Sequence, residues 1–308
     1  MVNRLQARVA AVVAAVALPL AIGACGGGGE TRSDEPGASR SRADEVTDKD
    51  FDRKNFSNGA TVDNKWNPLP PGAQYIFEGR SNRGQGRRPH RVIFTVTDLT
   101  KMINGVRTRV LWDRDINGGE LLEGELAFHA QDDDGNVWNL GEYPEEYERG
   151  EPVRAPDTWI AGLDGARAGI LMRASPRVGT PSYLQGRAPR IDFADRARVL
   201  KTGERDCVPL GCFEDVLVTD ETNPLEPNDG HQRKYYAAGV GNIRAANGPG
   251  GKERETLVLV KVRRLSRRAL AAVRRQALKL DKRAYAVRKS LYGRTPPAQR
   301  TIAGRPAP

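Results

Sequence analysis

Hydrophobic and polar residues alternate along short stretches of the chain between residues 73 and 262. Residues 91–99 and 105–112 alternate in this way, and in residues 121–130 Leu122, Leu126 and Phe128 share one face. Gly, Asn, Asp and Pro separate the stretches, a pattern typical of antiparallel strands with one solvated face. The predicted strands are 73–79, 91–99, 105–112, 121–130, 136–141, 213–219, 233–239 and 255–262. Eight or more strands without intervening helices predict a mainly β chain, folded as an antiparallel barrel, half-barrel or sandwich.

The β-rich domain is expected to span residues 51–262, with a rigid lead-in at Trp66-Asn-Pro-Leu-Pro-Pro-Gly72. Residues 143–200 contain much Gly, Pro and Arg and show no clear period. We expect loops and short strands there.

The pattern changes after Val262. Residues 263–293 form a predicted basic amphipathic helix, because 263–292 lack Pro and Gly and are rich in Ala, Leu, Arg and Lys. Gly293 is a plausible stop, and residues 294–308, which include Pro296-Pro297, are predicted to be disordered. The apolar stripe consists of Leu265, Ala269, Ala272, Val273, Leu280, Ala284, Val287 and Leu291.

The positive charge is concentrated in this C-terminal segment. The 308-residue chain has a formal net charge of +10, yet residues 263–308 carry 14 Lys and Arg and only one acidic residue, Asp281. The domain itself is therefore almost neutral, which argues against a nucleic-acid-binding domain and against nucleic acid as a partner. Two hypotheses remain for the helix: it packs on the domain, or it binds an anionic lipid surface or cell-wall polymer. The candidate surface-binding residues are Arg263, Arg264, Arg267, Arg268, Arg274, Arg275, Lys279, Lys282 and Arg283.

The first 24 residues have the layout of a secretory signal peptide. Arg4 and Arg8 precede 14 uncharged, mostly apolar residues, too few for a membrane span, and small residues then lead into Cys25. This stretch resembles a bacterial lipoprotein signal, which implies cleavage before Cys25 and lipid attachment to it. The expected location is the extracytoplasmic face of the cell membrane, held by that anchor. Residues 25–50 are polar and begin with four glycines after the cysteine, so we expect a flexible tether.

Cys207 and Cys212 are the other two cysteines of the chain. The Pro-Leu-Gly turn between them brings extended flanks together, so we predict a disulfide in an oxidising compartment. A zinc site is not indicated, because the three histidines show no paired spacing.

Two acidic loops are candidate calcium ligands. Asp113, Asp115 and Asn117 match the first half of a calcium-binding loop, and Asp132 and Asp134 form a second acidic group. Position 12 of the first loop is Gly124 rather than Glu, and both segments also suit hairpin turns, at Asn117-Gly118 and Gly135-Asn136. Calcium is therefore an open alternative, and no other cofactor is expected.

Glu123, Glu125 and His129 fall on one face of the strand at 121–130. Residues two apart on a strand lie about 6.8 Å apart, so these side chains could line a groove and hydrolyse a glycan by acid–base catalysis. The alternative interpretation, which the pattern favours, is the solvent face of a half-buried strand.

Several phrases of residues 56–262 resemble a family of uncharacterised actinobacterial secreted proteins and lipoproteins. They include Asn67-Pro-Leu-Pro-Pro-Gly72, Ala130-Gln-Asp-Asp-Asp-Gly-Asn-Val-Trp138 and Lys234-Tyr-Tyr-Ala-Ala-Gly-Val-Gly241. The last phrase also resembles the final strands of incomplete β-barrels of envelope proteins, some of which hold apolar ligands. The family supplies no catalytic residue, and catalytic signatures such as Gly-x-Ser-x-Gly are missing from the sequence.

The preferred hypothesis is a lipid-anchored, non-enzymatic envelope protein that binds an apolar or polymeric envelope ligand or a protein partner. The alternatives are a surface glycan hydrolase that uses acidic residues of strand 121–130, and a calcium-stabilised structural module.

Overall fold

The computed structural model describes residues 51–82, 86–250 and 255–301. The predicted signal peptide 1–24, the lipidated Cys25 and the tether 25–50 lie outside the described residues, so those expectations stay predictions. Residues 302–308 of the expected tail lie outside them as well.

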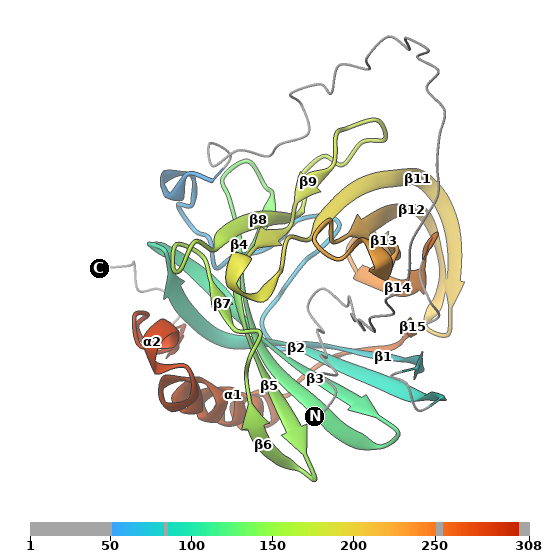
Figure 1. Ribbon diagram of the computed structural model, residues 1–308. Helices are drawn as coiled ribbons and strands as arrows, with labels where there is room; N and C mark the ends of the chain where they lie inside the picture. Colours follow the sequence, from blue (N-terminus) through green and yellow to red (C-terminus); the bar gives the residue numbers. More distant parts are fainter. Residues whose placement is uncertain (1–50, 83–85, 251–254, 302–308) are drawn as a thin grey trace, which may run out of the picture.

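The described chain is mainly antiparallel β-sheet, curled into a nearly closed barrel (Figure 1), which confirms the predicted fold class. Neighbouring strands run in the order β10-β8-β5-β4-β3-β2-β1-β15-β14-β13-β12-β11-β9. Three short strands lie off this path: β6 and β7 pair with β5, and β16 pairs with β2. The strands are β1 Ala73–Asn82, β2 Arg87–Ile103, β3 Val106–Asn117, β4 Glu120–Gln131, β5 Val137–Glu148, β6 Glu151–Arg154, β7 Trp159–Ile160, β8 Arg167–Met172, β9 Tyr183–Leu184, β10 Gly186–Arg187, β11 Arg196–Val208, β12 Gly211–Thr222, β13 Gln232–Ala237, β14 Gly241–Asn247, β15 Glu255–Arg264 and β16 Gln299–Arg300.

The two ends of the strand path are consecutive in the chain. β9 pairs with β11 and β10 pairs with β8, and Gln185 alone separates β9 from β10. The Gln185 amide donates towards the Leu171 carbonyl at 3.4 Å and the Glu221 carboxylate at 3.3 Å, so one side chain bridges both edges. Gly169 permits this crossing, since a Cβ there would lie 2.3 Å from the Gln185 carbonyl carbon. The chain itself therefore closes the barrel.

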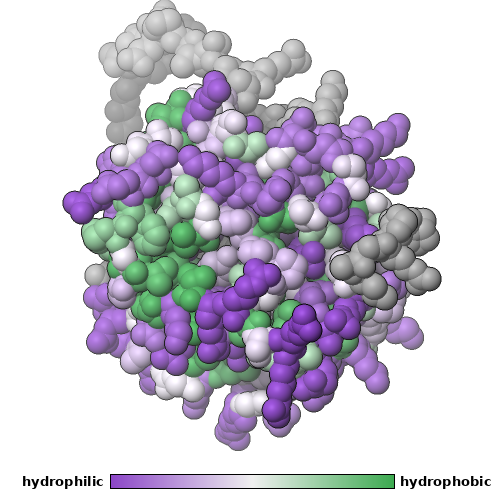
Figure 2. Space-filling model, turned by 180° about the vertical axis from the view of Figure 1, so that it is seen from behind, coloured by the Kyte–Doolittle hydropathy of each residue, from purple (hydrophilic) through white to green (hydrophobic). Residues whose placement is uncertain are grey.

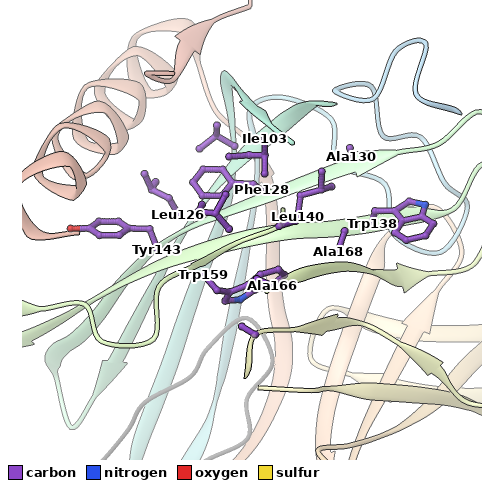
Figure 3. Close-up of a cluster of buried hydrophobic side chains, with 14 of the residues drawn as sticks. Ile103, Leu126, Phe128, Ala130, Trp138, Leu140, Tyr143, Trp159, Ala166 and Ala168 are labelled. Atoms are coloured by element: carbon purple, nitrogen blue, oxygen red, sulfur yellow. The ribbon is translucent and has the colours of Figure 1, made fainter. Parts of the chain in front are cut away.

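A helical layer covers the outer face of β2–β5 (Figure 1). The helices are α1 Arg267–Val287 and α2 Lys289–Tyr292, and three short 3-10 helices lie elsewhere at η3 Arg53–Asn55, η4 Pro189–Ile191 and η5 Pro227–Asp229. The Ser266 hydroxyl caps α1 by accepting the Ala269 amide at 3.2 Å. Leu126 and Phe128 on the outer face of the sheet belong to the same buried cluster as Leu280 of α1, part of which Figure 3 shows.

The expected disorder of residues 294–308 is wrong for the described part of that segment. Lys101 of β2 is buried and donates to Asp281 at 3.0 Å and to the Pro296 carbonyl at 2.8 Å. Asp281 also accepts the Ala298 amide at 3.1 Å, and β16 then adds to β2. The helical segment ends at Tyr292, before Gly293, and the chain after it is held on the sheet by this buried ion pair.

Besides β16, two strands have no predicted counterpart, β11 and β14. Lys201, Gly203, Glu204 and Arg205 interrupt any alternation in β11, and its pairing with β12 has three register shifts. Residues 143–200 contain only short strands after the end of β5, as the sequence predicts. Cys207 and Cys212 form a disulfide at the tip of the β11–β12 hairpin, with their Cα atoms 4.0 Å apart.

Few large hydrophobic side chains are exposed among the described residues. They are Val153, Val178, Leu210, Leu225, Val262 and Val287. Figure 2 shows the molecule from behind, where hydrophilic residues cover most of the surface and hydrophobic ones gather on the left. Among the described helices, none combines the length and apolar character needed to span a membrane.

Candidate functional site

The barrel interior holds a cavity of about 140 Å³ that is partly open to solvent. Its lining comes from β1, β2, β3, β4, β8, β13, β14, β15 and two turns, so most of the barrel wall contributes. The lining residues are Asn67, Pro68, Leu69, Tyr75, Phe77, Val92, Phe94, Asp113, Glu125, Ala127, His129, Leu171, Gln232, Lys234, Tyr236, Val240, Gly241, Asn242, Ala245 and Leu257.

One wall of this cavity is apolar and aromatic. Tyr75 and Phe77 of β1 pair with Phe94 and Val92 of β2, and Leu257 of β15 pairs with Gly79 next to them. The register places these side chains on the same interior face, because paired residues of antiparallel strands point to the same side. Such a wall suits the hydrocarbon or ring part of a ligand.

The adjoining wall carries polar side chains from β3 and β4. Asp113 pairs with Glu125, and a register shift in the pairing of β4 with β5 separates Ala127 from His129. Asp113, Glu125 and His129 are 5%, 2% and 4% exposed. The expectation that this face of residues 121–130 meets solvent is therefore wrong. The face of β4 that carries Leu126 and Phe128 lies under α1. Closure of the barrel buries the other face, which carries Glu125 and His129.

Glu125 and His129 are buried without satisfying all their polar atoms. Glu125 Oε1 and both ring nitrogens of His129 have no hydrogen-bond partner among the described residues. Burial raises the pKa of Glu125 well above its ordinary value, and Glu142, Glu123 and Asp113 raise it further. Burial, with a smaller effect of Lys234, lowers the pKa of His129 to about 3. Burial therefore disfavours the charged form of both groups.

The pKa of Asp113 is raised as well. Burial raises its pKa to about 7, although the Arg114 amide, which donates to Asp113 at 2.7 Å, works in the opposite direction. Asp113 and Glu125 are thus two adjacent carboxyl groups that face a cavity with no ion pair to either one among the described residues.

The basic residue in the cavity, Lys234 of β13, already has an acidic partner. Its ammonium lies 2.7 Å from the Glu221 carboxylate. Burial alone would lower the pKa of Lys234, but Glu221 outweighs it and the pKa is raised. Gln232 and Tyr236 flank it on the interior face of the strand. Lys234 and Tyr236 lie in the predicted strand 233–239 and Gln232 directly precedes it, but the sequence assigned none of them to a site; their period-two spacing is the signal that could have done so.

A second interior cluster lies at the end of β2 and β3. His90 Nε2 lies 2.8 Å from Asp115 and His90 Nδ1 lies 3.1 Å from Glu255, all three being buried. Burial would lower the pKa of His90, but its contacts with Asp115 and Glu255 outweigh this and raise the pKa to about 10. The imidazolium therefore acts as a buried counter-ion that links β2, β3 and β15.

The candidate calcium ligands are separated by the structure. Asp113, Asp115 and Asn117 lie in β3, where Asp115 contacts His90 and Asn117 donates to Ser81. Asp132 and Asp134 lie in the turn between β4 and β5. Asp132 accepts the Trp138 indole N–H at 2.7 Å, and Asp134 accepts from Asn55 at 2.7 Å. Among the described residues, no group of three or more His, Cys, Asp or Glu side chains is placed to hold a metal ion.

Glu123 and Glu125, the carboxylates considered for glycan hydrolysis, do not both face the cavity. Glu125 lines the cavity whereas Glu123 does not, although both are buried. The carboxyl group that faces the cavity next to Glu125 is that of Asp113 on the neighbouring strand.

The predicted basic helix contacts the domain through one face and presents the other to solvent. Ala277, Leu280, Asp281 and Ala284 are its buried residues. The predicted start of the helix at residue 263 is wrong, because Arg263 and Arg264 end β15 and α1 begins at Arg267. Three of the candidate surface-binding residues pair with other side chains of the domain: Arg263 donates to Gln74 at 2.8 Å, Arg274 donates to Asp98, and Arg283 donates to Glu145 at 2.9 Å. The other six, Arg264, Arg267, Arg268, Arg275, Lys279 and Lys282, are exposed.

No family model matches the sequence, and a search of curated proteins finds no match either. Two solved structures are distantly similar. One is a predicted exported protein of YmcC-like fold from Bacteroides fragilis NCTC 9343, with 14% identity and a TM-score of 0.35 over 65% of this chain and 99% of that one. The other is a predicted lipoprotein from Parabacteroides distasonis ATCC 8503, with 12% identity and a TM-score of 0.35 over 65% of this chain and 100% of that one. At this distance neither likeness carries an argument about function.

Proposed function

We propose that this chain is a lipid-anchored envelope protein whose barrel interior binds a small ligand that has an apolar part. The observation that carries the proposal is a partly open cavity that combines an aromatic wall with unsatisfied polar side chains next to it. Binding pockets for small molecules combine these two features, since apolar contacts supply affinity and a few polar groups fix orientation. The export signal and Cys25 support the location.

Binding without catalysis is favoured by the chemistry of the interior. Burial disfavours the charged forms of Glu125 and His129, and among these three groups only Asp113, with a pKa raised to about 7, has a pKa that suits a general base. A general base needs a pKa near the working pH and a proton within reach. We therefore keep the glycan hydrolase and the calcium module as alternatives without a supporting geometric observation.

Native mass spectrometry of residues 26–308, purified gently from the organism's own envelope extract, tests the proposal. That form contains every strand and helix described here. We expect a retained adduct whose mass identifies the class of ligand. A bare mass in repeated preparations, together with no binding of added small amphiphiles, would contradict it.

A second activity is supported by the outward face of α1. Arg268, Arg275, Lys279 and Lys282 recur at helical spacing on the side opposite Ala277 and Ala284. Over 14 residues this basic stripe is about 21 Å long. We propose that it contacts the anionic lipid surface beside the anchor, where each basic residue contributes about 1 kcal/mol. An anionic cell-wall polymer is the alternative partner.

A further inference from the structure

We propose that the ligand of the barrel carries a protonated amine on an apolar body, with the amine between Asp113, Glu125 and His129 and the body against the aromatic wall. This inference rests on the proposed function and adds the charge of the ligand to it. Four features of the interior support it.

The first feature is the unequal pairing of charged side chains in the cavity. Lys234 is neutralised by Glu221 at 2.7 Å, so no uncompensated cation is left to attract an anionic ligand. Asp113 and Glu125 have no ion-pair partner among the described residues. A cation is the group that these carboxyls lack, because buried carboxylates are otherwise paired or protonated.

The second feature is the set of hydrogen-bond acceptors. A primary ammonium group has three N–H donors and no acceptor. Glu125 Oε1 and one ring nitrogen of a neutral His129 are buried acceptors without a donor among the described residues. Asp113 adds a further carboxyl oxygen beyond the one that accepts the Arg114 amide. A carboxylate ligand has no donor for these acceptors.

The third feature is the aromatic wall. Tyr75, Phe77 and Phe94 line the cavity beside the carboxyls, because β2 pairs with β3. Aromatic faces attract ammonium groups as well as apolar chains, by about 0.5–2 kcal/mol for a cation near the ring. An amine with a short hydrocarbon body therefore meets favourable groups on both walls.

The fourth feature is the protonation of the Asp113 and Glu125 carboxyls. Glu125 is faced by Glu123 on its own strand, Asp113 on β3 and Glu142 on β5, and Lys234 on β13 acts on His129. Asp113 is faced by Asp115, Arg114 and Glu255. Burial and the surrounding acids favour the protonated form of both carboxyls, and an arriving ammonium group favours their ionised form. Each carboxyl that ionises loses its proton to the buffer, so binding of the cation releases protons from the protein.

Isothermal titration calorimetry with a matched series tests this inference: hexylammonium, 1-hexanol and hexanoate, added to residues 26–308 at pH 7.5. We expect hexylammonium to bind at least about tenfold more tightly than hexanol, as one charge-assisted contact allows. Hexanoate should bind more weakly than both. Titrations in buffers of different ionisation enthalpy should show proton release for hexylammonium alone.

Glu125→Gln keeps the size of the side chain and removes its charge, so it should abolish the preference for hexylammonium while hexanol still binds. Glu78→Gln is the matched control, because Glu78 lies on the outer face of β1 beside Arg91, and it should change nothing. Circular dichroism checks that each variant is folded.

Equal or tighter binding of hexanol or hexanoate, or a preference for the amine that survives Glu125→Gln, would overturn the amine inference and leave the barrel a binding site. Binding of none of the three, together with a bare native mass, would overturn the proposed function as well.

Discussion

Asp113 shows how the closed barrel sets the chemistry of a single side chain. On a strand with one wet face this carboxyl would stay ionised at neutral pH. Here burial between β2 and β4 raises its pKa to about 7, and the Arg114 amide offsets only part of that effect. Asp113 therefore lowers the stability of the folded protein at pH values at which the carboxyl is ionised in the unfolded chain.

Asp113→Asn should therefore stabilise the protein more at high pH than at low pH. The pKa of the folded state, about 7, exceeds the ordinary value of 3.8, so the contribution of Asp113 to stability is present below pH 3.8 and is lost as pH rises through 7. We expect the gain in unfolding free energy to be about 2–3 kcal/mol larger at pH 8 than at pH 5. Chemical denaturation at the two pH values measures it.

The control for this experiment is Asp215→Asn, which alters a surface ion pair with Lys65 whose two side chains are 60% and 55% exposed. Such pairs contribute little, so its effect should stay below about 1 kcal/mol at both pH values. An Asp113→Asn gain that is the same at pH 5 and pH 8 would show that the carboxyl is ionised in the folded state.

The two faces of the strand at residues 121–130 differ in how well the sequence predicts them. The alternation of residues 121–130 correctly predicts a strand with Leu126 and Phe128 on one face. It does not show that the Glu125 and His129 face is buried too, since polar residues on alternate positions normally meet water. Helix α1 covers one face of β4, and closure of the barrel at Gln185 encloses the other. Both kinds of contact join residues that are far apart in the sequence.

At the scale of elements, the Lys101–Asp281 pair fixes α1 and the chain after it to the sheet. Lys101 also donates to the Tyr285 hydroxyl at 2.9 Å and lies 4.2 Å from the centre of the Tyr292 ring. Asp281 accepts the Tyr292 hydroxyl at 2.7 Å. Helix, tail and strand are thus joined by one buried network.

Lys101→Met should lower the unfolding free energy by about 3–5 kcal/mol, because it leaves the Asp281 carboxylate buried without its cation. Adding Asp281→Asn to Lys101→Met should recover at least about 1 kcal/mol of that loss, since the uncompensated charge is then absent. Hydrogen exchange should become faster in α1 and in residues 294–301. Additive effects of the two substitutions would mean that the two groups do not interact.

The basic stripe of α1 gives a prediction that is independent of the barrel interior. Reversing three charges with Arg275→Glu, Lys279→Glu and Lys282→Glu should weaken binding of residues 26–308 to anionic vesicles at least about tenfold, at about 1 kcal/mol per basic residue. Co-sedimentation with vesicles of phosphatidylglycerol and phosphatidylcholine measures this.

The matched control reverses Arg80, Arg177 and Arg187 to Glu, which are exposed residues away from the helix. It changes the net charge equally and should retain most of the binding. Equal losses in both triple variants would mean that net charge, rather than the stripe, drives adsorption. Binding of wall polymer but not of vesicles would assign the stripe to the polymer.

The helix and eight strands could be predicted because their periods are local properties of the sequence. The strand at 196–208 could not, since Lys201, Glu204 and Arg205 break its alternation and irregular pairing holds it in place. The tail at 294–301 has no periodic signal, and its contact with β2 depends on Lys101, almost two hundred residues earlier.

At the scale of the whole molecule, the account depends on a barrel that closes without filling its interior. Gly169 leaves room for the segment around Gln185 that closes the barrel. Trp66 and Leu69 of the lead-in belong to one of the buried hydrophobic clusters. Ala127 and Ala245 line the cavity that remains. None of these features is visible as a motif, because closure depends on the sum of strand pairings around the barrel.

The most direct test of the central claim is a comparison of retained adduct by native mass spectrometry between two variants, Ala245→Phe and Ala286→Phe. Ala245 lines the cavity, whereas Ala286 is exposed on α1. Filling the interior should cost about 1–3 kcal/mol of stability and leave the protein folded. The account predicts that Ala245→Phe loses the adduct and Ala286→Phe keeps it at the wild-type level. Equal adduct in both variants would show that the ligand binds outside the barrel and would contradict the account.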